Sequence, residues 1–416
     1  MHTIEGHTSF AENLGQLLKR FCPEGLLKAL GDALEHIKST ERELTEKAKS
    51  KEAESLVEHS IVDTANLEHI VTECGQGLAP REFFELLFEI GSLCLRFGEF
   101  RTAKTVFTQI IDEAGSESRF GSVVGRAYCK RAEIRLRQAQ WTTAQNDLKR
   151  GAQVFKKAKN VEGLAGIENS LGIFATEQGD TKKAVTHFKK AQTGFDRSGD
   201  AERSCAALMN LGIVNTIAGQ WDEALAYYQR ILPQFEKLGK VSRLVELHHN
   251  LGMLFLAKGD SQAALSQFDE SLNQARFIQY RAFVGLAYLG KATAYARLAD
   301  HPLAVVFVDK ALTIFRELND RLSIADTYRV KGIIHRVLNH PQIAELYFKT
   351  SLRLNEECNN PLNMGETYFE LGQLYKDTQQ NTKAAQTLKK AVGFFKKVGA
   401  QSDARNAQAV LAAVAS

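Results

Sequence analysis

Apolar residues recur at intervals of three and four along most of the chain, from about residue 81 to about residue 400. This i, i+3, i+4, i+7 spacing is typical of amphipathic helices. Glycine, asparagine and aspartate interrupt it at regular intervals and divide it into helices of about 15–18 residues. The pattern therefore predicts an all-α chain.

The helices repeat with a period of 40 residues. The stretches NSLGIF, MNLGIV and HNLGML begin at residues 169, 209 and 249. Three columns keep this frame over eight copies: a small residue, an alanine 12 residues later, and a bulky residue four residues after that. The columns are Gly91, Ala132, Gly172, Gly212, Gly252, Ala292, Gly332 and Gly372; Ala103, Ala144, Ala184, Ala224, Ala264, Ala304, Ala344 and Ala384; and Phe107, Leu148, Phe188, Tyr228, Phe268, Val308, Phe348 and Leu388.

These columns predict pairs of closely packed helices. Two helices approach closely only where a side chain is small, and a bulky residue one turn later fills the space beside the contact. One pair cannot bury its apolar faces alone, so successive pairs must stack. Turn residues on the same frame separate the helices within units, from Gly98 to Gln379, and between units, for example at Gly199 and Asn359. Glycine and asparagine there fit left-handed helix ends, and Asp180, Asp260 and Asp300 fit N-caps.

A helix–turn–helix unit with Leu-Gly, a central alanine and a following aromatic residue resembles the tetratricopeptide repeat (TPR). The copy with Leu211-Gly212, Gly219, Ala224 and Tyr228 carries the resemblance well, and the 40-residue period resembles the subclass of kinesin light chains, Pins-type adaptors and bacterial TPR regulators. The resemblance covers roughly residues 81–400. It implies a right-handed superhelical solenoid of about eight repeats whose first helices line a concave groove.

Both ends depart from the period. Residues 401–416 predict a C-terminal capping helix, and residues 1–80 predict helices near 9–20, 24–48 and 50–73, as a bundle, a coiled coil or diverged repeats. Within the array, Pro80, Pro302, Pro341 and Pro361 suit helix starts. Pro233 lies inside a helical pattern and predicts a kink or an early helix end.

Charge and composition narrow the function classes. Residues 1–80 carry 8 Lys/Arg and 14 Asp/Glu, whereas residues 81–416 carry 45 and 35. The excess of ten positive charges is thin and interleaved with acids, so we expect neither a nucleic-acid partner nor, without a long apolar run, a membrane partner. The six cysteines are scattered, which predicts reduced thiols, no metal site and a cytoplasmic protein.

No catalytic signature is present. The chain lacks the phosphate-binding, dinucleotide-binding, zinc-protease and nucleophile-elbow motifs. We therefore predict a protein that is not an enzyme, has no catalytic residues and needs no cofactor.

The resemblance assigns candidate peptide-binding residues to the concave groove. Neutral candidates on three successive first helices surround the Leu-Gly pair, and a carboxamide can bond a peptide backbone at either of its groups. The alternative is that these asparagines bond only to neighbouring helices. The candidates are Asn169, Met209, Asn210, Ile213, His249, Asn250 and Met253.

Arg297, Arg329 and Arg336 form a second candidate group on later first helices. Arginine pairs readily with a carboxylate or phosphate of a partner. Asp326 and Glu366 are close enough in the pattern to neutralise part of the group, so ion pairs within the array are the alternative.

Two functions follow from these features. The first is a non-catalytic scaffold or adaptor that binds a protein or peptide in the groove. The second is an intracellular regulator in which the array senses a peptide and controls residues 1–80. The sequence also leaves open a homo-oligomer formed through the N-terminal segment or the ends of the array.

Overall fold

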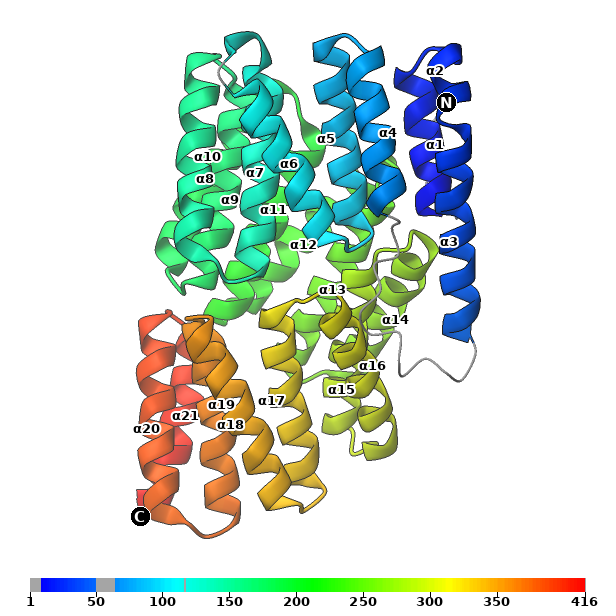
Figure 1. Cartoon of the computed structure of the whole chain (residues 1–416). Coiled ribbons are helices and arrows are strands. Elements are labelled where there is room, and N and C mark those ends of the chain that lie inside the picture. The colour runs from blue at the N-terminus through cyan, green and yellow to red at the C-terminus, as the bar shows by residue number, and fades with distance from the viewer. Residues whose placement is uncertain (1–8, 50–63, 116, 416) are drawn as a thin grey trace. The chain divides into compact units, whose positions relative to one another are not determined.

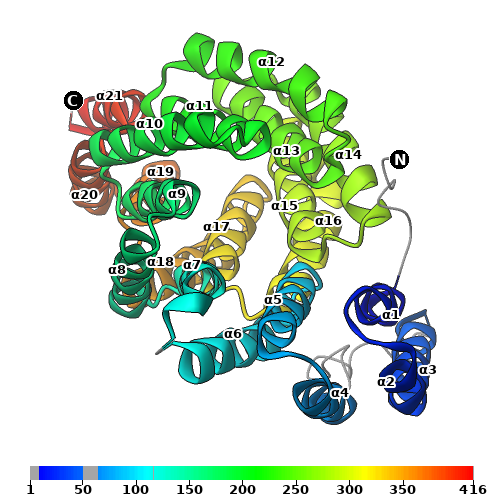
Figure 2. The same ribbon diagram turned by 90° about the horizontal axis from the view of Figure 1, so that it is seen from above.

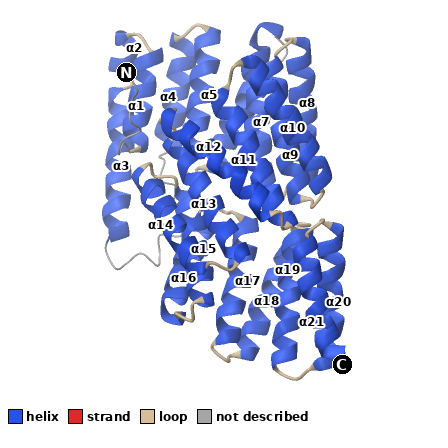
Figure 3. Cartoon of the chain, turned by 180° about the vertical axis from the view of Figure 1, so that it is seen from behind, coloured by secondary structure: helices blue, strands red, loops and turns tan. Residues whose placement is uncertain are grey.

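The computed structural model describes residues 9–49, 64–115 and 117–415. These residues form α-helices, a short 3-10 turn at Ser118–Phe120 and connecting loops, and they contain no β-strand (Figure 3). The all-α prediction is therefore confirmed. Within the same ranges, no helix has the length and apolar content needed to cross a membrane.

Among the residues described before the repeats, four helices are present: α1 (Phe10–Phe21), α2 (Glu24–Ala29), α3 (Gly31–Lys49) and α4 (Thr64–Gly77). Ser9 and Glu12 form a reciprocal capping box that defines the start of α1. The single helix predicted over residues 24–48 is wrong, because the chain turns at Leu30 and α3 begins at Gly31, a residue type that weakens a continuous helix. The helix predicted from residue 50 begins at Thr64 within the described residues, and residues 50–63 lie outside them.

Sixteen helices then follow as eight pairs (Figure 1). The first helices of the pairs are α5 (Pro80–Arg96), α7 (Gly121–Arg137), α9 (Val161–Glu177), α11 (Ala201–Ala218), α13 (Val241–Lys258), α15 (Arg281–Arg297), α17 (Arg321–Val337) and α19 (Pro361–Asp377). The second helices are α6 (Phe100–Ala114), α8 (Trp141–Lys157), α10 (Thr181–Ser198), α12 (Trp221–Lys237), α14 (Ser261–Phe277), α16 (His301–Glu317), α18 (Pro341–Glu357) and α20 (Asn381–Lys397). The last helix, α21 (Gln401–Ala415), follows α20 as expected for residues 401–416.

The helix ends follow the predicted chemistry. Proline occupies the first turn of α5, α16, α18 and α19. Asp180, Asp260 and Asp300 accept hydrogen bonds from backbone N–H groups three residues later. Pro233 is an exception: of the kink or early helix end predicted there, the early end is wrong, because α12 continues through the proline to Lys237.

The glycine column lies directly against the bulky column. A Cβ atom on Gly172, Gly212 or Gly252 would lie 2.4–2.5 Å from the ring of Phe188, Tyr228 or Phe268, respectively. These rings are almost fully buried. Glycine is therefore required because the aromatic ring of the second helix occupies the space that a side chain on the first helix would take.

The chain divides into two compact units. Unit 1 comprises the described residues of Met1–Arg135, Thr142–Leu164 and Phe277–Arg281, and unit 2 comprises Leu136–Trp141, Ala165–Arg276 and Ala282–Ser416. In unit 2, Figure 2 shows α11, α13, α15 and α17 on the inner side of the curved array and α12, α14 and α16 outside them. Unit 2 therefore carries an inner layer of first helices and an outer layer of second helices.

Within unit 2, the fourth helix pair also contacts the eighth pair and the last helix. Ile217 at the end of α11 packs against the core cluster that α20 and α21 form. A Cβ atom on Gly219 would lie 2.8 Å from Cβ of Ser402 at the start of α21. The end of the array is thus held against its earlier helices by apolar packing.

Candidate functional site

The neutral candidates lie on α9, α11 and α13, where the repeat places a polar residue two or three positions before the Leu-Gly glycine. The Nδ2 of Asn210 donates a hydrogen bond to Oδ1 of Asn169, at 2.9 Å. Asn250 is half-buried, and its carboxamide makes no hydrogen bond to any residue that the structure describes. Asn210 and Asn169 thus bond across neighbouring helices, whereas Asn250 keeps its donor and acceptor available.

The apolar candidates separate by burial. Met253, three residues after Asn250, is 43% exposed, and Ile213 is half-buried. Met209 is only 4% exposed and lies in the core cluster of α11 to α13. Met253 and Ile213 are therefore accessible from outside the core, while Met209 packs within it.

His249 lies between two aromatic rings. Its ring centroid is 5.6 Å from that of Phe268 and 5.7 Å from that of Phe283. Burial lowers the pKa of His249 to about 4, and its Nδ1 atom has no hydrogen-bond partner among the described residues. His249 is therefore neutral near pH 7 and packs between these two rings.

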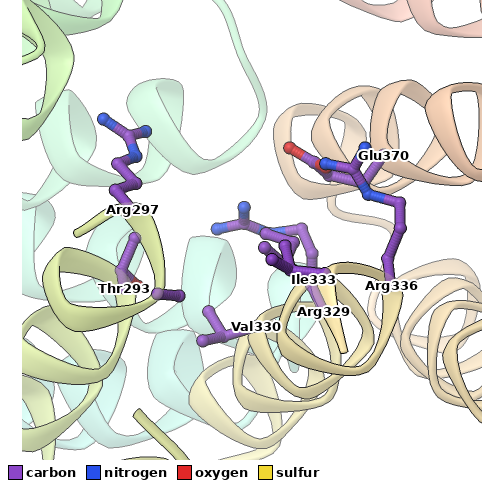
Figure 4. Close-up of a pocket in the computed structure, with 9 residues that line it drawn as sticks. Thr293, Arg297, Arg329, Val330, Ile333, Arg336 and Glu370 are labelled. Carbon is purple, nitrogen blue, oxygen red and sulfur yellow. The ribbon is translucent and has the colours of Figure 1, made fainter. Parts of the chain in front are cut away.

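A pocket of about 200 Å³ lies on the inner helices α15, α17 and α19 (Figure 4). Its apolar wall comes from Ala296, Val330, Ile333 and Val337, and the three candidate arginines and Glu370 supply its charged groups. A pocket with apolar walls and a few convergent polar groups is the usual form of a ligand site.

Two of the three arginines are engaged by carboxylates of the array. Arg329 pairs with Asp326 and lies 3.0 Å from Glu366. Arg336 pairs with Glu370 at 3.0 Å and with Asp377 at 2.9 Å. These ion pairs link α17 to α19, so both arginines hold adjacent repeats together.

The pKa values of this cluster reflect the burial. Burial raises the pKa of Glu366 to about 7, although Arg329 opposes the shift. Despite the opposing effect of burial, the carboxylates of Asp326 and Glu366 raise the pKa of Arg329 above its usual value. Arg329 therefore stays charged, and Glu366 titrates near neutral pH.

Arg297 differs from the other two arginines. Its guanidinium donates a hydrogen bond to the backbone carbonyl of Leu256 on α13, and its side chain is exposed. Within the described part of the chain it has no carboxylate at ion-pair distance. Figure 4 shows Arg297 on the opposite side of the pocket from Arg336 and Glu370, so it is the arginine available to a ligand.

Sequence reasoning missed several pocket residues, although they occupy the same positions of the 40-residue repeat as the candidates that it named. Val330 and Glu370 occupy the position of Asn210 and Asn250, and Thr293 and Ile333 occupy that of Ile213 and Met253. Extending the 40-residue frame to later copies would have identified them. Among the described residues, no group of three His, Cys, Asp or Glu side chains has an arrangement suited to a metal ion.

Comparison with known proteins agrees with this architecture. Residues 203–276 and 365–396 match family models described as tetratricopeptide repeat. No curated protein matches the chain by sequence.

Three solved structures have a similar fold. A Rap protein complexed with competence and sporulation factor gives a TM-score of 0.60 at 13% identity, over 88% of this chain and 99% of that chain. The Rap conjugation gene regulator of the plasmid pLS20, in complex with the Phr* peptide, gives 0.58 at 16%, over 94% and 97%. NprR in complex with its cognate peptide NprX gives 0.52 at 15%, over 76% and 88%. At these identities the likeness shows a shared fold.

Proposed function

Given that the chain is a tetratricopeptide-repeat protein, we propose that the inner helices of unit 2 bind an extended peptide segment of a partner. The observation that carries the proposal is Asn250, whose carboxamide is half-buried and unbonded beside the exposed Met253. A carboxamide at this depth can donate to and accept from one peptide unit, and a methionine adapts to varied apolar side chains.

Asn210 and Arg297 extend this surface on either side of Asn250. Asn210 donates to Asn169 and retains its own carbonyl oxygen as an acceptor, whereas Arg297 presents a cation beside the apolar wall of the pocket. A peptide held at these positions would lie across α11, α13 and α15 and bury its apolar side chains against Ile213 and Met253. Two of the similar structures are complexes with peptides, which supports the same ligand class here.

The experiment compares peptide binding after replacement of Asn210 and Asn250 with binding after replacement of a control asparagine. Short synthetic peptides are screened against the full chain, and those that bind are measured against Asn210→Ala with Asn250→Ala. Loss of two backbone hydrogen bonds should weaken binding by about tenfold to thirtyfold with little change in melting temperature. Asn273→Ala is the control, because Asn273 is exposed on the second helix α14.

Two results would contradict the proposal. In the first, no peptide binds the full chain, which leaves the inner surface without its ligand class. In the second, the double variant melts at a much lower temperature while its peptide affinity is unchanged, so the asparagines serve packing alone.

A second candidate is a regulator in which peptide binding changes the state of α1–α4. It is favoured by the similarity to the pLS20 protein, a gene regulator in complex with a peptide, which covers 94% of this chain. Hydrogen exchange of the α1–α4 amides in the full chain, with and without a bound peptide, distinguishes the two functions. Unchanged exchange at peptide saturation favours the simple adaptor.

A further inference from the structure

Positive charge on the outer layer of unit 2 is concentrated on two helices. α10 carries five Lys or Arg residues against one aspartate, and α20 carries five lysines and no carboxylate. The second helices between them in the chain, α12, α14, α16 and α18, carry seven basic residues and ten acidic ones. The repeats therefore differ in charge although they share one architecture.

All the basic side chains of α10 and α20 are exposed, and we call this set the basic strip: Lys182, Lys183, Lys189, Lys190, Arg197, Lys383, Lys389, Lys390, Lys396 and Lys397. Within the described residues, Lys183 forms an ion pair, with Asp180 at 2.7 Å, and no other member of the strip does. The other nine charges thus have no carboxylate at ion-pair distance, although Lys383 donates a hydrogen bond to Gln380 and Lys390 lies over the ring of Tyr368.

The two helices of the strip meet end to end within unit 2. A Cβ atom on Gly399, just after α20, would lie 2.7 Å from Oγ1 of Thr181, the first residue of α10. One on Gly179 would lie 2.2 Å from Cγ1 of Val398. Figure 1 shows α20 below α10 along the same side of the array. The C-terminal end of α20 and the N-terminal end of α10, about 200 positions apart in sequence, are therefore in contact.

The spacing of the charges is regular along both helices. Adjacent basic pairs recur after seven residues, at 182–183 and 189–190 on α10 and at 389–390 and 396–397 on α20. Seven residues are two helical turns, or about 10.5 Å along the axis. Each helix therefore carries two adjacent basic pairs on nearly the same side, and Arg197 and Lys383 are single basic residues beyond the pairs.

The composition of the strip indicates its kind of partner. No large exposed apolar side chain lies on α10 or α20, so the strip lacks both the anchors of a protein interface and the groups that insert into a lipid surface. Nine of its ten basic residues are lysines, which act as hydrated point charges and need no bidentate geometry. Contrary to the expectation from the charge averaged over residues 81–416, we propose that the basic strip binds the sugar–phosphate backbone of double-stranded nucleic acid without reading its base sequence.

The test uses the full chain and fluorescein-labelled DNA duplexes of two unrelated sequences, with fluorescence anisotropy at a series of salt concentrations. Both duplexes should bind equally in low salt, and affinity should fall steeply with salt, with a log–log slope of about −0.9 for each phosphate neutralised. K389E/K390E/K396E/K397E should weaken binding at least tenfold and reduce the slope by about three to four.

A charge-matched control separates the strip from net charge. R230E/K237E/K310E/R316E makes the same change in net charge at exposed residues of α12 and α16, and its affinity should stay within about threefold of the unmodified chain. Circular dichroism checks the folding of both variants. If the fourfold variant does not fold, K389E/K390E replaces it, with R230E/K237E as its control.

The proposal is overturned if neither duplex binds in low salt, or if the strip variant and its control lose the same amount of DNA affinity. It is also overturned if one duplex sequence is preferred, or if polyglutamate displaces the labelled DNA as well as unlabelled DNA of the same total charge does. The last result assigns the strip to acidic proteins instead. Binding to phosphatidylserine vesicles without binding to DNA assigns it to membranes and overturns the proposal as well. The inner peptide surface is on other helices, so each result is independent of the proposed peptide binding.

Discussion

Gly252 shows how closely a single residue controls the packing of a repeat. The ring of Phe268 lies where a Cβ atom of residue 252 would be, and that ring is fully buried. The ring cannot move outward without opening the core between α13 and α14. The glycine is therefore a packing requirement and not a source of flexibility.

Gly252→Ala should destabilise the chain by about 1–3 kcal/mol, because the added methyl group overpacks the joint. Gly393→Ala is the matched control, since Gly393 lies within α20 with no atom near its Cβ position, and it should raise stability by up to about 1 kcal/mol. Urea unfolding of both variants checks the pair. Equal effects of the two substitutions would contradict the steric explanation.

The inner-facing asparagines and arginines show that residue type alone does not predict which side chains are available to a ligand. Asparagine and arginine at inner-facing positions suggested ligand contacts for Asn169, Asn210, Arg329 and Arg336 alike. The structure bonds the two asparagines to each other and pairs the two arginines with carboxylates of α17 and α19. Only the distances distinguish these side chains from Asn250 and Arg297.

At the scale of the helix, the ends were predictable because their chemistry is local. All eight turn positions between the helices of a pair have a positive φ, whether the residue is glycine, asparagine, alanine or glutamine. The 40-residue frame therefore determines the backbone conformation even where the residue is unfavourable for it. Local composition alone would not assign a left-handed conformation to Ala299, which has a φ of 62°.

Ala299→Gly should raise the stability of the chain by about 0.5–1 kcal/mol, because glycine removes the left-handed strain at this turn. Asn339→Gly is the comparison, at the same turn of the next repeat with a φ of 58°. Asparagine tolerates this conformation, so its replacement should have a smaller effect. Calorimetry of the two variants measures the difference, and a larger gain at Asn339 would refute it.

Helix continuity was harder to predict than helix ends. The stripe of leucines in residues 24–48 indicated one helix, but the chain turns at Leu30. Conversely, Pro233 suggested a kink or an early helix end, and α12 continues through it to Lys237. In the second case, the buried residues Ile231 and Phe235 on either side of the proline hold the helix in place, so packing overrides local propensity.

At the scale of the whole molecule, unit 2 brings early and late repeats together. Ile217 of α11 packs on the cluster that includes Phe395, Val398 and Ala404. The period of 40 residues indicates contacts between neighbouring repeats only. This long-range contact depends on the small rotation between successive repeats, which accumulates along the array and is not visible in the sequence period.

Ile217→Asp should weaken this contact, because it places a charge against an apolar cluster. Hydrogen exchange in α21 should accelerate about tenfold, corresponding to about 1.4 kcal/mol of local stability. Ile213→Asp on the same helix is the control and should leave exchange in α21 unchanged. If α21 exchanges at its original rate in Ile217→Asp, the contact does not stabilise the end of the array.

The sequence by itself determined the all-α class, the 40-residue repeat, the turns and the helix pairs, because all of these depend on side chains close together in the chain. It also selected the inner helices on which the candidate residues lie. The tertiary structure alone decided which polar groups are already paired, since Asn169 and Asn210 or Arg336 and Glu370 meet only after helices stack. Only the tertiary structure brings α10 and α20 together. In the net charge of the whole chain, their lysines are offset by the acidic residues of other helices. The reason is physical: periodicity specifies contacts between adjacent repeats, whereas the charge and ligand-binding capacity of a surface depend on distances between side chains that are far apart in sequence.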